Sequence, residues 1–425
     1  MQPGAMSKRL VQLAWRNLWR NPQRTLISLA AIALGYVMLL VFSCLMEGFR
    51  QQVIDSGTRL RLSHMQVHTP GYYPDRSIYE TLGGREGTNV NGLLAAITSH
   101  SWVRAAAPRV YGYGLVSCGD DTIRAEILGV LPAWERPITT LHTRIVEGNY
   151  LTEQMPKGVV LGDKLADTIG ARVGSEVVLL APAADGSMGN DLYTVVGIFH
   201  TELEIIDRGL VLMLLPALQE LLSLTPGRIH EIGITLADPS EATTVASALE
   251  ARLGKTLPVR VRAWPELAPD LADYVQLFRR IMSVLFVIVF LLAIIGIMNT
   301  MLMAVLERTR ELGVLMALGV QPIQVISLIV AEAGCLVGAS LVLGGGIGAS
   351  LLWYLQVHGL NLHSLMSEVS LPIVGAVVDP FLHGRQDFSA YSRVTLGLAL
   401  TAFVSAIYPA LRAARLRPVE AIRKV

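Results

Sequence analysis

The sequence predicts an α-helical membrane protein with four transmembrane helices and a large α+β extracytoplasmic domain inserted between the first and the second. Apolar residues make up 52% of the chain and charged residues only 16%, whereas a soluble globular domain has about 25% charged residues. Four stretches are long and apolar enough to cross a bilayer core of about 30 Å, which needs about 20 residues. Residues 47–277, by contrast, have the mixed composition of a globular domain.

The four predicted spans differ in length and in polar content. They are residues 26–46, 278–306, 323–355 and 393–411. The second span is uncharged over residues 281–306, which as a helix would be about 39 Å long at 1.5 Å per residue. Because that exceeds the bilayer core, we expect this helix to tilt or to protrude toward its charged end.

The third span contains one ionisable residue, Glu332, and several glycines. A carboxylate near the middle of a membrane costs about 2.5–3.5 kcal/mol, so Glu332 either makes a buried polar contact that couples helix movements, or lies near the interface as a hydrated or merely structural group. Some of the glycines have small-xxx-small spacing, which permits close helix packing in a bundle or dimer. They are Gly334, Gly338, Gly344, Gly345, Gly346 and Gly348.

Positive charges flank the outermost spans and orient the chain. Those before the first span are Lys8, Arg9, Arg16, Arg20 and Arg24, and those after the last are Arg412, Arg415, Arg417, Arg423 and Lys424. Because Lys and Arg stay on the cytoplasmic side, we expect both termini in the cytoplasm, with residues 412–425 as a tail.

Residues 1–25 are expected to form a cytoplasmic amphipathic helix that lies in the membrane interface. Val11, Ala14, Trp15 and Leu18 share one helical face, and the arginines share the other. A solvated basic tail is the alternative.

Residues 47–277 are expected to fold as two small subdomains. Apolar alternation and turn residues predict a mostly β subdomain around residues 145–212 and an α+β subdomain assembled from both flanks. Residues 356–392 are predicted to be a second extracytoplasmic segment, a loop between the last two spans.

No catalytic, cofactor-binding or metal-binding site is predicted. Gly254, Lys255 and Thr256 resemble the end of a phosphate-binding loop, but Leu249 stands where its first glycine is needed. His64 and His68 lie on a strand-like stretch, where a spacing of four residues separates side chains by about 13 Å. The net charge of +1 gives no reason to expect nucleic-acid binding. The other polar candidates are scattered through the 356–392 loop: His358, His363, Glu368, Asp379, His383 and Asp387.

A short charged segment, residues 307–322, joins the second and third spans. Leu312, Leu315 and Met316 form an apolar stripe at helical spacing, which suits a groove in a partner protein. Gly319, followed by Pro322, ends this helix. The charged residues beside the stripe can form ion pairs at the rim of such an interface; they are Glu307, Arg308, Arg310 and Glu311.

Two long motifs resemble a known family of membrane proteins. GIMNTMLMAVLERTRELGVLMALGVQPIQVISLIVAEA, residues 296–333, and YPALRAARLRPVEAIRKV, residues 408–425, are similar to the permease signature of the MacB/FtsX-like ABC transporters, also called type VII or mechanotransmission systems. Residues 148–182 are similar to the periplasmic domain of that family. In layout, with four spans and a large insert, the chain is similar to the lipoprotein-releasing permeases LolC and LolE.

The resemblance implies a non-catalytic permease in the bacterial inner membrane. It implies a cytoplasmic ABC ATPase dimer, which holds ATP and Mg²⁺, as partner, and a second permease that is the same chain or a sister. No cofactor is expected on this chain. The positions that match the ATPase-coupling helix are Glu307, Arg308, Arg310, Glu311, Leu312, Gly313, Leu315, Met316 and Gly319. Those that match the cytoplasmic C-terminal contact are Tyr408, Pro409, Arg412, Arg415 and Pro418.

The family's branches imply three functions. Release of lipoproteins toward an outer membrane is the first expectation, because no fused ATPase is seen and the insert is large. Export of a periplasmic peptide, lipid or drug through an adaptor and a channel is the second. Regulation of a cell-wall hydrolase by the outer domain is the third. The cargo is expected to be a lipoprotein or a lipophilic molecule, in contact with membrane lipids.

Overall fold

The computed structural model describes residues 12–84, 89–254, 257–361, 372–373, 376–377, 381–385 and 388–415. The chain divides into two compact units. The first, here called the membrane unit, comprises Met1–Arg50, Leu277–Ser364 and Pro380–Val425. The second, here called the insert unit, comprises Gln51–Gln276 and Leu365–Asp379.

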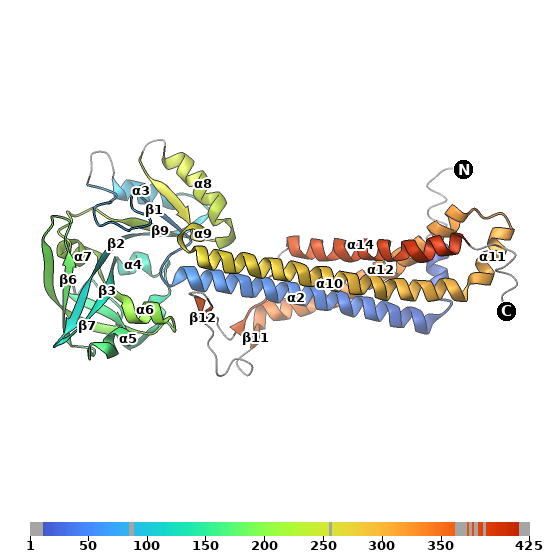
Figure 1. The fold of residues 1–425 in the computed structure, drawn as a ribbon, viewed down its shortest axis with the longest axis horizontal. Coiled ribbons are helices and arrows are strands. Elements are labelled where there is room, and N and C mark those ends of the chain that lie inside the picture. Colours follow the sequence, from blue (N-terminus) through green and yellow to red (C-terminus); the bar gives the residue numbers. More distant parts are fainter. Residues whose placement is uncertain are drawn as a thin grey trace. The chain divides into compact units, whose positions relative to one another are not determined.

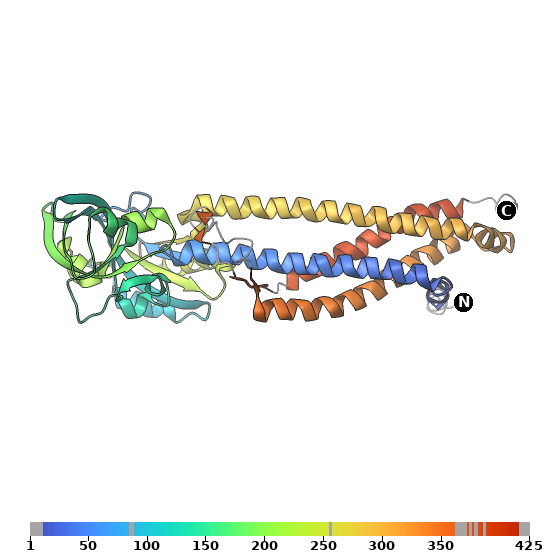
Figure 2. The same cartoon turned by 90° about the horizontal axis from the view of Figure 1, so that it is seen from below.

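Four long helices run alongside one another in the membrane unit (Figures 1 and 2). They are α2 (Pro22–Arg59), α10 (Pro269–Glu307), α12 (Pro322–His358) and α14 (Phe388–Ala414). Each is long and apolar enough to cross a membrane, and in the described part of the chain they are the four helices of this kind. The predicted fold class is therefore confirmed: four transmembrane helices, with an α+β domain between the first and the second.

The predicted loop at residues 356–392 is partly helical. α12 continues to His358 and α14 already begins at Phe388, because helical hydrogen bonding extends beyond the apolar residues on which the prediction relied. Gln321 begins α12 with a capping box, and Gly359, with a φ of +67° that favours glycine, ends it. Two short strand pairs follow: β11 (Leu360–Asn361) with β14 (Phe381–Leu382), and β12 (Pro372–Ile373) with β13 (Ala376–Val377).

Two of the six glycines in α12 bring this helix close to α2. A side-chain carbon at Gly344 would lie 2.9 Å from the carbonyl oxygen of Ala33 and 3.0 Å from the ring of Tyr36. One at Gly348 would lie 2.9 Å from a methyl group of Leu40. These distances are too short for a real side chain, so the close packing requires glycine. The positions that face open space are Gly334, Gly338 and Gly346.

One ten-stranded sheet organises the insert unit. Its strands are β1 (Met65–His68), β2 (Val103–Cys118), β3 (Asp121–Val130), β4 (Ile145–Gly148), β5 (Gly158–Gly162), β6 (Glu176–Pro182), β7 (Met188–Phe199), β8 (Leu210–Leu214), β9 (Glu231–Leu236) and β10 (Arg260–Ala263). They follow the order β10-β1-β9-β2-β3-β8-β5-β7-β4, and β6 pairs with both β7 and β2. The path from β2 through β3, β8, β5, β7 and β6 thus returns to β2 and closes a barrel.

The mostly β subdomain predicted around residues 145–212 is not separate from its flanks, because it forms a barrel that also contains β2 and β3. β2 is long enough to serve both halves of the sheet: its residues 103–109 pair with β9, and its residues 115–117 pair with β6. β3 then joins β8 in parallel. The flanking segments therefore contribute two strands to the barrel, and the sheet is continuous.

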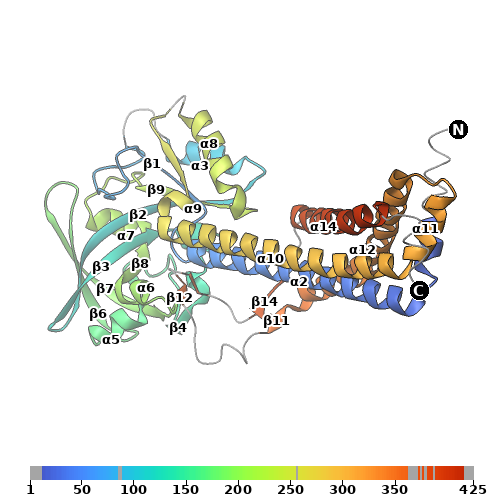
Figure 3. The ribbon, with the colours of Figure 1, turned by 45° about the vertical axis from the view of Figure 1, so that its right-hand side comes forward.

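Short helices cover the two halves of this sheet. Figure 3 shows α3 and α8 beside β1 and β9, and α5 and α6 beside the barrel strands. The helices of the insert unit are α3 (Val90–Thr98), α4 (Pro132–Glu135), α5 (Asp163–Thr168), α6 (Glu204–Gly209), α7 (Leu215–Leu221), α8 (Ala242–Leu253) and α9 (Trp264–Leu267), with 3₁₀ turns η1 (Leu141–Thr143) and η2 (Pro239–Glu241).

The histidines of this core act as hydrogen-bonding groups. His64 Nδ1 accepts from the backbone N–H of Leu236 at 3.0 Å. His230 Nδ1 accepts from the N–H of Tyr111 at 2.9 Å, so its other nitrogen donates to the Ile78 carbonyl at 3.1 Å. Burial of the ring lowers the pKa of His230 to about 4.

Candidate functional site

α11 (Thr309–Ala317) forms an elbow between α10 and α12 (Figure 1). Arg308 separates α10 from α11 because its backbone is not helical (φ −102°, ψ 15°). After α11, Gly319 has a φ of +97°, which favours glycine. The elbow helix therefore begins after Arg308 and ends before Gly319.

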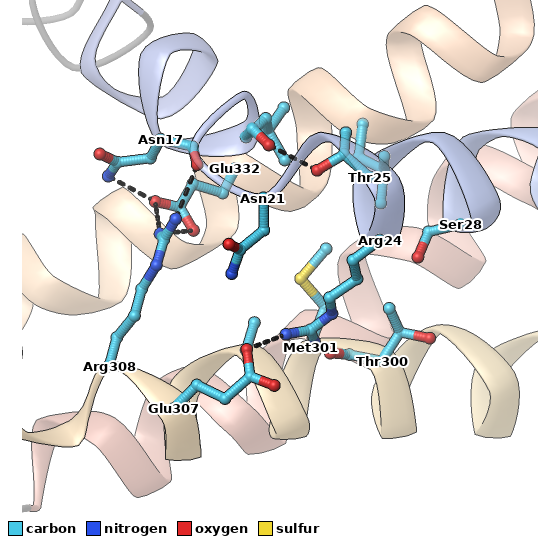
Figure 4. Close-up of a pocket in the computed structure, with 13 residues that line it drawn as sticks. Asn17, Asn21, Arg24, Thr25, Ser28, Thr300, Met301, Glu307, Arg308 and Glu332 are labelled. Carbon is cyan, nitrogen blue, oxygen red and sulfur yellow. Dashed lines mark hydrogen bonds and ion pairs between the residues drawn. The ribbon is translucent and has the colours of Figure 1, made fainter.

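Glu332 is buried and is held by two partners from distant parts of the chain (Figure 4). The side-chain amide of Asn17 donates to Glu332 Oε1 at 2.7 Å, and Arg308 Nη1 donates to the same oxygen at 3.2 Å. Arg308 Nη2 also donates to the Asn17 carbonyl at 2.6 Å. The structure shows a buried polar contact and not a hydrated group, and the coupling of helix movements by Glu332 stays a prediction. This carboxylate joins α12 to the start of the elbow and to the N-terminal segment.

Two further ion pairs join the N-terminal segment to the elbow. Arg20 makes two hydrogen bonds to Glu311, at 2.7 and 2.6 Å, and these lower the pKa of the Glu311 carboxyl. Arg24 pairs with Glu307 at 2.6 Å and also donates to the carbonyl of Thr300. Solvent screens exposed pairs such as Arg20 with Glu311, so this pair adds little to the stability of the fold.

Three of the four charged residues expected at a partner's rim are thus engaged within the chain. Glu307, Arg308 and Glu311 bind Arg24, Glu332 and Arg20. Arg310 is exposed, and within the described residues it has no ion pair. Glu307 and Glu311 are nevertheless exposed and Arg308 is half-buried, so ion pairs between this segment and a partner stay a prediction.

The sequence predicted Arg20 and Arg24 as charges that orient the chain, in an interfacial amphipathic segment, and indicated no role for Asn17. One signal was available, because Arg20 and Arg24 have the same four-residue spacing as Glu307 and Glu311. The two segments pair in an antiparallel way: Arg20 binds Glu311, and Arg24 binds Glu307.

The expected apolar stripe of α11 is divided between two faces. Leu312 is buried in a cluster with Val325 and Ile329 of α12, and Met316 packs against this cluster. Gly313 is also buried. The apolar residues left exposed are Val314, Leu315 and Leu318. The predicted stripe was therefore wrong for Leu312 and Met316, which pack inward against α12, whereas Leu315 is exposed.

The predicted C-terminal contact lies beside the elbow. Ala410 and Ala413 of α14 belong to the same cluster as Leu312, and Pro409 is buried next to them. Tyr408, Arg412 and Arg415 are exposed. Pro418 lies outside the described residues.

The N-terminal helix comprises residues 12–18 in the described part of the chain. Ala14 is fully buried, and Leu18 packs against the bundle core. Trp15 is exposed and meets Trp19 edge to face, with ring centroids 6.0 Å apart. Val11, the remaining member of the predicted apolar face, lies outside the described residues.

A cleft of about 500 Å³ opens between the N-terminal segment, α10, α11 and α12. Arg20, Arg308, Glu311, Leu315 and Glu332 are among its lining residues. Arg20, Arg308, Glu311 and Glu332 are joined in ion pairs that link these helices, whereas Arg310, which also lines the cleft, has none among the described residues.

The chain matches two family models in succession: the MacB-like periplasmic core domain over residues 25–252, and the FtsX-like permease C-terminal domain over residues 283–418. It is 25% identical to the lipoprotein-releasing system transmembrane protein LolC of Neisseria meningitidis, over 94% of each chain. It is 24% identical to the macrolide export ATP-binding/permease protein MacB of Yersinia pestis, over 97% of this chain and 60% of that protein. The crystal structure of the periplasmic region of MacB from Actinobacillus actinomycetemcomitans is 13% identical with a TM-score of 0.35, over 52% of this chain and 99% of that one.

The first model covers more than half of the chain, and the second contains α11 and the ion pair of Arg308 with Glu332. The chain therefore belongs to the MacB/FtsX-like family of ABC-transporter permeases, as a non-catalytic, multi-pass membrane subunit with a periplasmic domain.

Proposed function

We propose that this permease releases lipoproteins from the bacterial inner membrane toward the outer membrane. Motion comes from a separate cytoplasmic ABC ATPase dimer that binds ATP and Mg²⁺, and the permease transmits it to the periplasmic domain. The observation that carries this function is similarity over nearly the full length of both chains to LolC, which is named for a lipoprotein-releasing system. Both termini and the elbow then face the cytoplasm.

The elbow is the proposed receiver of that motion. Its outward face offers Val314, Leu315 and Leu318 with Arg310 beside them, which suits an apolar groove with an acidic rim. Its inward face is fixed by Leu312 and by the ion pairs of Arg308 and Glu311 at its N-terminal end. A displacement of α11 is therefore passed to α10, α12 and the N-terminal segment together, because rigid packed elements carry such coupling.

The C-terminal part of α14 is the proposed second contact for the ATPase. Arg412 is exposed on α14 and Arg415 directly follows the end of this helix, whose Ala410 and Ala413 belong to the elbow cluster. A second permease, the same chain or a sister, completes the proposed complex of two permeases and two ATPases.

Export of a periplasmic peptide, lipid or drug is the second candidate function. The similarity to MacB along almost the whole of this chain favours it. In that case an adaptor and an outer-membrane channel would complete the pathway, and the cargo would leave the membrane region without a soluble lipoprotein acceptor.

A reconstituted assay tests the first function against the second. The detergent-solubilised permease is purified with its co-expressed ATPase, both are identified by mass spectrometry, and the complex is placed in liposomes with a labelled triacylated lipoprotein. We expect ATP, and not a non-hydrolysable analogue, to transfer the lipoprotein to a soluble acceptor protein. Transfer that is equal with and without hydrolysis, or an ATPase stimulated by a macrolide and not by the lipoprotein, would contradict lipoprotein release.

A further inference from the structure

Three potential metal ligands converge at one point in the insert unit. Asp163 is the first residue of α5, His200 follows the end of β7, and Asp207 lies in α6. One ligand atom of each residue lies within 4.8 Å of the other two. His200 Nδ1 is 2.9 Å from Asp163 Oδ2 and 3.4 Å from Asp207 Oδ2.

The oxygens that face His200 are the ones that backbone and hydroxyl donors leave open. Asp163 Oδ1 accepts from the N–H of Lys164 at 2.7 Å. Asp207 Oδ1 accepts both the N–H and the hydroxyl of Thr201, at 2.8 and 2.7 Å. In each aspartate, Oδ2 is directed at the imidazole. His200 Nδ1 is inaccessible to solvent, and among the described residues it finds no partner with hydrogen-bond geometry.

The backbone is shaped to bring the two aspartates together. A side-chain carbon at Gly162 would lie 2.2 Å from the carbonyl oxygen of Asp207 and 2.8 Å from its Cα. The end of β5 therefore passes so close to α6 that glycine is required, and the next residue, Asp163, is placed beside Asp207. Asp207 is 1% exposed, and the two bonds from Thr201 fix its orientation, as outer-shell partners do for metal ligands.

The spacing and chemistry of these atoms suit a divalent metal ion. In a tetrahedral site with bonds of about 2.0–2.1 Å, ligand atoms lie about 3.3 Å apart, close to the distances from His200 Nδ1. One imidazole nitrogen with two carboxylates suits ions such as Zn²⁺ and Mn²⁺. Asp163 and His200 are partly exposed, so water can complete the coordination.

We propose that Asp163, His200 and Asp207 form a structural binding site for a divalent transition-metal ion of the zinc or manganese class. The ion neutralises two neighbouring carboxylates and satisfies the buried Nδ1. It also connects α5, α6 and the end of β7, and so braces one end of the barrel.

Metal titration of the whole protein tests this site. The full-length permease in detergent is stripped with a chelator and titrated with Zn²⁺ or Mn²⁺ by calorimetry. We expect one saturable equivalent per chain and a higher midpoint of thermal unfolding. His200→Ala and Asp163→Asn should each weaken binding by more than about tenfold. Asp167→Asn removes the same charge from an exposed position of α5 and should bind like the parent protein.

Two results would overturn the site. One is the lack of saturable binding by the parent protein. The other is equal binding by the parent and by His200→Ala. Should the variants fail to fold, Co²⁺ added to the parent protein gives an independent readout, because a nitrogen–oxygen site of low coordination number produces visible ligand-field bands and an empty one does not. These measurements need neither the ATPase nor the cargo.

Discussion

Arg308 at the start of the elbow and Glu332 within α12 form an ion pair at 3.2 Å, and the Asn17 amide closes this contact from the N-terminal segment. Glu332 is 9% exposed, so removal of one partner leaves a charge with little access to water. Breaking a buried pair in this way costs about 3–5 kcal/mol. The elbow is thus attached to the membrane helices by a contact that tolerates loss of both charges better than loss of one.

A double-mutant cycle measures this contact. We expect Arg308→Met and Glu332→Leu each to lower the thermal unfolding midpoint of the purified permease. The double variant should be less stable than the parent. Its loss of stability should be smaller than the sum of the two single losses, by roughly 1–3 kcal/mol. Additive losses would show that the two side chains do not interact.

The pair of Arg20 and Glu311 should affect coupling and leave stability almost unchanged. Both residues are about half exposed, and an exposed pair adds little to stability because solvent screens it. Glu311→Arg places two like charges together and should reduce cargo-stimulated ATPase activity several-fold. The exchange of both residues, Arg20→Glu with Glu311→Arg, should restore most of it. If the exchange stays as impaired as the single variant, the pair has no positioning role.

The two faces of α11 should respond differently to substitution. Leu318 is 78% exposed and Leu312 is 6% exposed. Leu318→Asp should abolish co-purification of the ATPase while leaving the melting curve of the permease unchanged. Leu312→Ala should lower stability by about 2–5 kcal/mol, because it leaves a cavity in the elbow cluster. If the ATPase still co-purifies with the Leu318→Asp variant, it does not dock on this exposed face.

The contact between α2 and α12 can be tested with two glycines of one helix. Gly344→Leu should separate the helices, because its side chain would collide with Ala33 and Tyr36. Gly346→Leu adds the same apolar volume where a side-chain carbon meets open space. We expect the first variant to be lost from the membrane fraction or to unfold at lower temperature, and the second to behave like the parent. Equal behaviour of both would contradict the packing.

His230 should make the protein acid-sensitive. Its pKa is about 4 in the folded chain, below the ordinary value of 6.5. Between these values the unfolded chain binds a proton that the folded chain does not. The contribution of the neutral His230 ring to the stability of the fold is therefore complete above pH 6.5 and is lost as the pH falls toward 4. The loss amounts to about 3 kcal/mol. Thermal unfolding from pH 7.5 to 4 should show it, and His230→Gln should flatten the profile while His358→Gln, at an exposed position, leaves it unchanged.

The sequence predicted those parts of the fold that are determined by residues close together in the chain. The four helices follow from apolar length, and the elbow's end follows from Gly319. The exposed face of α11 did not follow, because Leu312 is directed inward by residues of α12 and α14 that lie elsewhere in the sequence. The closure of the barrel was missed for a similar reason, since one long strand, β2, changes partners halfway along its length.

The functional contacts were harder still to predict. Arg308 and Asn17 are separated by 291 positions, and Asn17 and Glu332 by 315. A helical wheel or a spacing rule reports only on neighbours within a few turns. Asp163, His200 and Asp207 likewise come from separate elements, and the tight passage at Gly162 that unites them is visible only in three dimensions.

The attachment of the N-terminal segment has a practical consequence for expression. A version shortened to begin at Pro22 would keep all four apolar helices and should insert and purify normally. It would lack Asn17 and Arg20, and with them the ties to Glu332 and Glu311. Good yield from such a trimmed protein would therefore say little about whether the elbow still transmits motion from the ATPase to the membrane helices.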